Sequence, residues 1–127
     1  MRPLCVYGEE LLLSAGDDPL AWGSYPLAPW AGRLRGGRFR FEGREYRMPC
    51  DSGAHAIHGT VFRRGWQIVA GDTLRIELQP DWPFDGFALQ RLRLHDHALE
   101  VRLELHARTQ PYPASAGFHP WFLRRLR

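Results

Sequence analysis

Apolar and polar residues alternate with a period of two along much of the chain, and no stretch of a dozen residues carries a helical stripe of apolar positions. Successive side chains of a strand point to opposite faces, so this alternation predicts strands that each bury one face. The sequence therefore predicts an all-β fold, an antiparallel β-sandwich with at most short helical turns in its loops.

Three alternating stretches are interrupted by turn-forming residue pairs, which predicts three β-hairpins. The stretches and their turns are 37–48 with Glu42-Gly43, 66–78 with Gly71-Asp72, and 87–107 with Asp96-His97. In the third stretch Phe87 and Leu89 are out of phase with the apolar residues that follow them. This change of phase predicts a β-bulge near Gln90-Arg91.

The segments between the strands are rich in glycine, proline and tryptophan, and we expect loops at 15–37, 49–65, 79–86 and 109–120. Three of these segments each place one polar residue among glycine, proline and aromatic residues. These polar residues are Arg33 after Trp30, His58 before Phe62, and His119 between Phe118 and Trp121. Sugars offer hydroxyls to such groups and a C–H face to aromatic rings, so the pattern favours a carbohydrate pocket on loops. A solvated arginine, a turn histidine and satellite core remain open as alternatives.

The formal net charge is +3, and every one of the 17 basic residues is arginine, because the sequence contains no lysine. Asparagine is absent as well, which we interpret as the mark of a high-GC, bacterial genome. Most arginines alternate with apolar residues, as on a solvated sheet face, so nucleic-acid binding is not expected. No apolar run is long enough to span a membrane or to form a signal peptide, and we expect a soluble cytoplasmic protein with no membrane partner.

Other chemistry has little support in the sequence. Cys5 and Cys50 are far apart and are interpreted as plain thiols. The pairs Asp96 with His97 and His55 with His58 lack a third ligand at a recognisable spacing, so no metal is expected. No serine stands in a nucleophile-elbow motif, and no glycine-rich dinucleotide motif follows a strand.

The order and spacing of the motifs resemble the aldose 1-epimerases, or galactose mutarotases. The motifs are Pro29-Trp30-Ala31-Gly32-Arg33, the stretch from Gly37 to Tyr46, Ile57-His58-Gly59 followed by Trp66, and His119-Pro120-Trp121-Phe122. The resemblance covers nearly all of residues 1–127, read as the N-terminal portion of one domain. One departure is visible, because many members carry asparagine where this chain has Gly32.

The resemblance implies a mutarotase-like supersandwich that interconverts the α and β anomers of a free hexose by acid/base ring opening, with no cofactor. It assigns the sugar-binding arginine to Arg33, the first active-site histidine to His58, and the proposed general acid to His119. Trp30 and Trp121 are expected to bind substrate. Family members are longer, and their second half supplies an aspartate and a glutamate general base. We therefore expect an incomplete fold that is inactive as this chain alone.

Several alternatives stay open at this stage. The chain is also compatible with a non-catalytic carbohydrate-binding module, or with a hexose-6-phosphate 1-epimerase in which arginines grip the phosphate. The Pro-Trp-x-x-Arg pattern favours the free-sugar branch. Expected partners are a hexose and either a separately encoded C-terminal half or a second copy of the chain.

Overall fold

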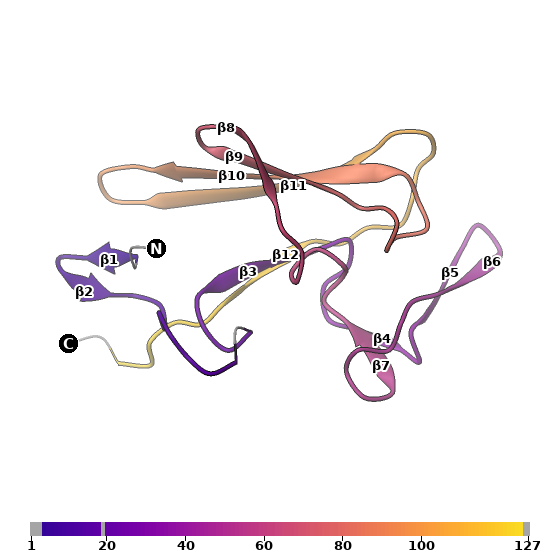
Figure 1. Ribbon diagram of the computed structural model, residues 1–127, viewed down its shortest axis with the longest axis horizontal. Helices are drawn as coiled ribbons and strands as arrows, with labels where there is room; N and C mark the ends of the chain where they lie inside the picture. The colour runs from indigo at the N-terminus through magenta and orange to yellow at the C-terminus, as the bar shows by residue number, and fades with distance from the viewer. Residues whose placement is uncertain (1–3, 19, 126–127) are drawn as a thin grey trace. The chain divides into compact units, whose positions relative to one another are not determined.

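The computed structural model describes residues 4–18 and 20–125, and this part of the chain contains strands but no helix, so it holds no helix that could cross a membrane. The strands pair into antiparallel sheets, which confirms the all-β prediction (Figure 1). In chain order they are β1 Cys5–Val6, β2 Glu9–Glu10, β3 Ser24–Leu27, β4 Arg33–Arg35, β5 Arg38–Phe41, β6 Arg44–Arg47, β7 His55–Ile57, β8 Gln67–Ala70, β9 Thr73–Glu77, β10 Gly86–Leu94, β11 Leu99–Ala107 and β12 Gly117–Pro120.

The chain forms two compact units. We call residues 27–117 the central unit, and the described residues of 1–26 and 118–127 the terminal unit. The central unit contains a four-stranded sheet in the order β11-β10-β9-β8 and the two-stranded pairs β4-β7 and β5-β6. The terminal unit contains β1-β2, and most of the pair β12-β3 also lies there.

The three predicted hairpins are confirmed. Strands β5 and β6 are joined at Glu42 and Gly43, whose φ values of 48° and 76° are both positive, as the tightest hairpin turns require. Strands β8 and β9 flank the turn at Gly71-Asp72. Strands β10 and β11 pair without interruption from Gly86 opposite Ala107 to Leu94 opposite Leu99.

The predicted β-bulge near Gln90-Arg91 is wrong, because β10 keeps a continuous register with both of its neighbours through these residues. Phe87 and Leu89 instead lie on the face of the four-stranded sheet that carries most of its arginines and carboxylates, which we call the charged face. Phe87 is covered there by the His106 ring, at 4.6 Å between centroids, and by the Arg75 guanidinium, 3.8 Å from the ring centroid. Stacking and cation–π contacts thus allow an aromatic residue on this face without a change of register.

The expected loop boundaries need a second correction. The segments 15–37, 49–65 and 109–120 contain the short strands β3, β4, β7 and β12. Strands of three or four residues are too short to show a clear alternation, and the glycines and prolines around them resemble loop sequence. Arg33, His58, His119 and Trp121 are therefore carried on or directly after short paired strands, and Trp30 lies between β3 and β4.

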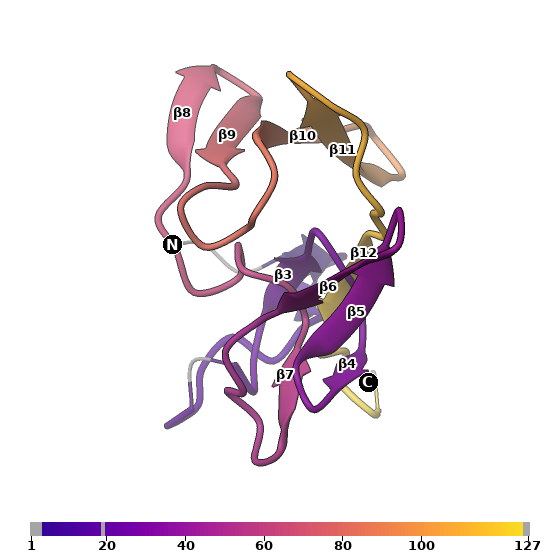
Figure 2. The same cartoon turned by 90° about the vertical axis from the view of Figure 1, so that its right-hand side faces the viewer.

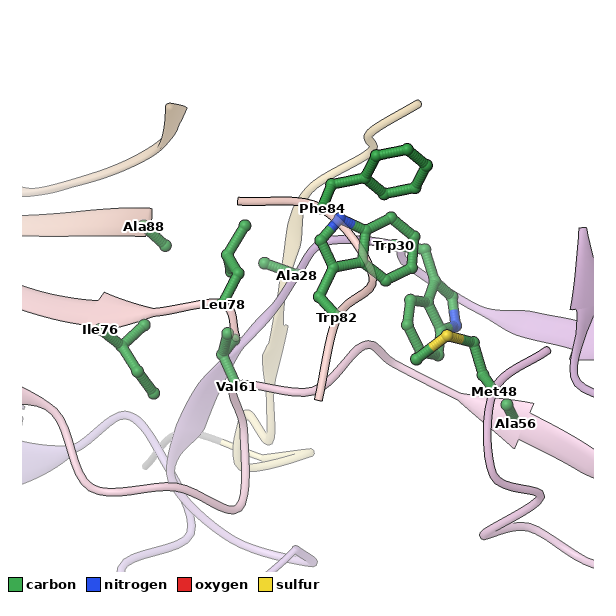
Figure 3. Close-up of a cluster of buried hydrophobic side chains, with 10 residues drawn as sticks. All are labelled: Ala28, Trp30, Met48, Ala56, Val61, Ile76, Leu78, Trp82, Phe84 and Ala88. Atoms are coloured by element: carbon green, nitrogen blue, oxygen red, sulfur yellow. The ribbon is translucent and has the colours of Figure 1, made fainter. Parts of the chain in front are cut away.

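The core lies in the central unit, and Figure 3 shows its buried side chains. The β5-β6 hairpin packs onto the segment between β9 and β10. Trp82 and Phe84 of that segment are almost fully buried. Phe39 stacks on Trp82 with ring centroids 5.1 Å apart, and Tyr46 lies 4.9 Å from Phe84. The alternating aromatic residues of the hairpin therefore supply one wall of the core.

The charged face of the four-stranded sheet carries paired arginines and carboxylates. Glu77 accepts hydrogen bonds from Arg108 (Nη2···Oε1 2.9 Å) and Arg75 (Nη2···Oε1 2.8 Å). The hydrogen bond from Arg108, with a further one from Arg75, holds the pKa of the Glu77 carboxyl below its ordinary value. Because its arginines are paired with carboxylates, this face carries little net charge.

The opposite face of the sheet is apolar, and it is only partly covered. Ile76 and Ala88 are buried in the core, whereas Leu94 near the β10-β11 turn is 78% exposed and Ile68 on β8 is 77% exposed. The strand registers place these four residues on one face, since the side chains of each strand alternate. We call the exposed part around Leu94 and Ile68 the open apolar face.

We predict that the chain self-associates through the open apolar face, because burying exposed apolar area is favourable. Light scattering should show an apparent mass that rises with protein concentration, and Leu94→Glu should reduce this rise. His97→Glu adds the same charge at the exposed hairpin turn and serves as the control, with little expected effect. A monodisperse monomer at high concentration would contradict the prediction and favour a self-contained binding module.

Candidate functional site

Arg33 begins β4, which pairs antiparallel with β7, so that Arg33 lies opposite Ile57 (Figure 2). Leu34, the next residue along, packs against the core, while the Arg33 side chain is exposed. The alternation within this short strand turns the Arg33 guanidinium away from the core. The strand pair thus presents a cation beside the residue that follows β7.

That residue is His58, and it is tied to the residue before Arg33 by two hydrogen bonds. The His58 backbone N–H donates to the Gly32 carbonyl oxygen (2.9 Å), and the Gly32 backbone N–H donates to His58 Nδ1 (3.3 Å). His58 has a φ of 62° and Gly32 a φ of 79°, both in the left-handed region, and a Cβ at Gly32 would meet open space. The two predicted site segments therefore form one hydrogen-bonded unit.

Gly59 explains why a glycine follows His58. Its φ is 82°, and a Cβ at this position would overlap the carbonyl group of Ala28. Ala28 and Gly59 form an isolated parallel bridge, and the Thr60 backbone N–H donates to the Ala28 carbonyl oxygen (2.8 Å). Only a residue without a side chain fits this approach, so the His-Gly dipeptide joins the two segments at their closest point.

Ser115 also contributes to this arrangement, and the sequence reasoning missed it. Its Oγ accepts a hydrogen bond from the Ala31 backbone N–H (3.0 Å), and its own backbone N–H donates to the Pro29 carbonyl oxygen (2.9 Å). The contact joins residues 84 positions apart in the chain. The sequence around Ser115 shows only that it lacks a nucleophile-elbow motif, whereas the structure shows that it holds the segment from Pro29 to Ala31.

Trp30 is placed in the core of the central unit. It is 8% exposed, and its ring centroid lies 5.6 Å from that of Trp82 (Figure 3). Core side chains therefore cover most of the Trp30 indole. This packing anchors the segment that leads to Arg33. Whether Trp30 also contacts a sugar stays a prediction.

His119 and Trp121 belong to the terminal unit. The His119 ring stacks on Tyr25 with centroids 4.9 Å apart and an interplanar angle of 11°, and it lies 5.2 Å from the Trp121 ring. Trp121 is anchored by its Nε1, which donates to the Leu20 carbonyl oxygen (2.9 Å). The structure thus brings together Arg33 with His58, and separately His119 with Trp121. The convergence of these two pairs on one sugar stays a prediction.

A second polar feature lies on the charged face of the four-stranded sheet, but it is less suited to a ligand. It is a shallow depression lined by Arg91, Arg93, Glu100 and Arg102. Arg93 contacts Asp72 (Nε···Oδ2 3.3 Å), and Arg102 contacts Glu104 (Nε···Oε1 2.8 Å). The carboxylates offset the arginines here, so an anion would have to compete with existing ion pairs.

The described residues contain no group of three or more His, Cys, Asp or Glu side chains placed to hold a metal ion. His55 and His58 stand at the two ends of the same short segment, and each ring accepts a hydrogen bond from a different glycine backbone N–H. For His55 the donor is the Gly36 backbone N–H, which lies 3.2 Å from His55 Nδ1. Both Nδ1 atoms therefore have structural roles.

Comparison with known proteins identifies the family. The family model described as aldose 1-epimerase matches residues 6–125, and the chain belongs to this family, whose members act on sugars. It is 31% identical over 120 residues to the uncharacterized protein YihR of Escherichia coli K12, covering 87% of this chain and 39% of that protein. It is 30% identical over 104 residues to the uncharacterized protein YphB of the same organism, covering 77% of this chain and 36% of that protein.

The chain therefore spans less than two thirds of the length of both curated relatives. No solved structure matches it significantly. The family match extends across both units, because it includes the Arg33 and His58 segments of the central unit and the His119 segment of the terminal unit.

Proposed function

We propose that this chain carries the hexose-binding part of an aldose 1-epimerase active site, which interconverts the α and β anomers of a free hexose. The observation that carries the proposal is the pair of hydrogen bonds between Gly32 and His58, which hold the Arg33 segment and the His58 segment of the family pattern as one unit. A cation and an imidazole carried on two segments that are hydrogen-bonded to each other are suited to orienting the hydroxyls of one sugar ring.

The proposed reaction opens and closes a cyclic hemiacetal. A base removes the proton from the anomeric hydroxyl, the bond between the anomeric carbon and the ring oxygen breaks, and an acid protonates that oxygen. The freed aldehyde rotates, and the reverse proton movements close the ring on its other face. We assign the acid to His119, because imidazole exchanges protons near neutral pH. Arg33 and His58 orient the ring.

We do not assign the base to Asp51, the carboxylate that contacts β7, because its oxygens already have structural partners. Asp51 accepts a hydrogen bond from the Ile57 backbone N–H (3.0 Å) and forms an ion pair with Arg63 (Nη1···Oδ2 3.3 Å). Asp51 therefore fixes β7 in place. We assign the base to a carboxylate from the part of the longer family members that this chain does not match.

Polarimetry of freshly dissolved α-D-glucose or α-D-galactose tests the proposal. We expect the 127-residue chain to accelerate mutarotation very little, because a missing base lowers the rate by about a hundredfold to ten-thousandfold. Joining the C-terminal part of a close relative, by fusion or in trans, should restore the activity. The C-terminal part alone is the control. A fusion that binds hexose without accelerating mutarotation would contradict the enzyme and support a carbohydrate-binding module.

A further inference from the structure

Strand β11 forms a long edge of the four-stranded sheet, because β10 is the only strand that pairs with it in the part of the chain that the structure describes (Figure 2). It is nine residues long and pairs with β10 in an unbroken register. Folded proteins commonly protect an edge with a short strand, a bulge or a proline, since a free edge can pair with another chain. The opposite edge, β8, is short and has a register shift, whereas β11 has none of these features.

The backbone groups of alternate β11 residues point to this free edge. At one end of the hairpin the Ala98 carbonyl oxygen accepts from the His95 N–H (2.7 Å), and at the other the Arg108 N–H donates to the Asp85 carbonyl oxygen (3.2 Å). The even-numbered residues of this segment therefore bond toward β10. In an antiparallel pair the residues between them direct their N–H and C=O groups to the other side. These residues are Leu99, Val101, Leu103, Leu105 and Ala107.

We propose that β11 pairs antiparallel with β11 of a second copy of this chain, about a twofold axis at Leu103, so that two four-stranded sheets join into one. Leu99 and Ala107 lie four residues on either side of Leu103, so this axis pairs the whole strand. Leu103 then faces Leu103 of the second copy, and the two exchange backbone hydrogen bonds. On the same face, Val101 of each copy meets Leu105 of the other.

The charges of β11 fit this register. Arg102 of each copy faces Glu104 of the other, and Glu100 faces His106. Within one chain Arg102 already contacts Glu104 (Nε···Oε1 2.8 Å), so the two arginines and two glutamates around the axis alternate in sign. Opposite charges on directly facing residues of neighbouring strands are favourable. The charged residues, which discourage pairing with an unrelated strand, therefore favour pairing with a second copy.

The neighbouring registers bring like charges together. An axis at Arg102 would place the two Arg102 side chains opposite each other and Glu100 opposite Glu104. An axis at Glu104 would place the two Glu104 side chains opposite each other and Arg102 opposite His106. Like charges in facing positions are destabilising, and moving the axis further leaves an increasing part of β11 unpaired. An axis between two residues would set outward-pointing backbone groups against inward-pointing ones.

Two substitutions of opposite sign test the register in the full chain. Both are made in Leu94→Glu, the parent chain here, to suppress association through the open apolar face. Arg102→Glu and Glu104→Lys should each dimerise roughly tenfold more weakly than the parent, because two facing pairs of opposite charge become pairs of like charge. An equimolar mixture of the two should recover the dimer as a heterodimer, in which the glutamates of one chain face the cations of the other. Sedimentation equilibrium measures each dissociation constant.

Arg93→Glu is the matched control, because it makes the same change of charge on the same face of β10, one strand away from the edge. It should dimerise as the parent does. Circular dichroism checks that each variant is folded. If Glu104→Lys does not fold, the double variant Arg102→Glu/Glu104→Lys takes its place. It restores opposite charges both within and between the chains, and it should dimerise as the parent does.

Val101→Pro tests the edge itself, because it removes an N–H that points outward and leaves the bonds to β10 intact. This variant should stay monomeric. A monomeric parent chain, an unchanged dimer in Arg102→Glu, or a mixture no more dimeric than its components would overturn the proposal. Hydrogen exchange separates a second copy from another occupant. If the outward amides of β11 were protected only after the C-terminal part of a close relative is added, the edge would belong to that part and the proposal would fail.

Discussion

In a protein completed by the C-terminal part of a close relative, His119→Ala is expected to lower the turnover of hexose mutarotation by about two to four orders of magnitude, the usual effect of removing a general acid. The change of optical rotation with time at saturating sugar measures this turnover. His119 also packs against Tyr25 and Trp121, so circular dichroism should first show that the variant is folded. His119→Gln, which keeps a polar group but cannot transfer protons near neutral pH, should show a similar loss.

Arg33→Ala in the same completed protein is the contrasting variant. Arg33 is exposed and is proposed to bind hydroxyls, so its loss should chiefly raise KM, whereas loss of the acid should chiefly lower kcat. Full turnover in the completed His119→Ala protein would show that the acid is another residue, and the proposed mechanism would have to be abandoned.

Gly59→Ala is expected to destabilise the central unit by about 3 kcal/mol or more, from left-handed strain together with overlap in a packed contact. A Cβ at Gly59 would overlap the carbonyl group of Ala28, so the bridge between the Pro29 segment and the His58 segment must open. Chemical denaturation should show the loss of stability. Any sugar binding should weaken in parallel, since Arg33 and His58 would no longer be held together.

Gly53→Ala separates the two causes of this effect. Gly53 has a φ of 62°, but a Cβ there would meet open space, so only the cost of the left-handed backbone remains, about 1–2 kcal/mol. If Gly59→Ala were no more destabilising than Gly53→Ala, the close approach to Ala28 would not be the reason for the glycine.

The parts of the fold that could be predicted from the sequence are those in which local signals agree. The β5-β6 hairpin combines alternating aromatic residues with a Glu42-Gly43 turn, and the β10-β11 hairpin has strands of nine residues, long enough for a clear period of two. The family motifs also indicated that Arg33 and His58 belong to one site. The structure joins Gly32, the residue before Arg33, to His58 by two hydrogen bonds, and a shared sugar site stays a prediction.

The parts that could not be predicted depend on contacts between distant residues. Phe87 remains in register because Arg75 and His106 cover it, and no local pattern shows this. Ser115 holds Ala31 from 84 residues away. The burial of Trp30 against Trp82, a residue of a different segment, has no local signal in the sequence either. Tertiary packing decides each of these cases.

The left-handed backbone of Gly32 has a consequence for how this site tolerates amino-acid exchange. Glycine and asparagine are the residues that adopt this conformation at the lowest cost, and the space where a Cβ would lie is open. The asparagine that many family members carry at this position can therefore replace Gly32 without moving the backbone that meets His58. Both residues supply the same main-chain N–H and carbonyl group. An exchange of glycine for asparagine would therefore leave the contact with His58 intact, because the main chain and not the side chain of residue 32 makes it.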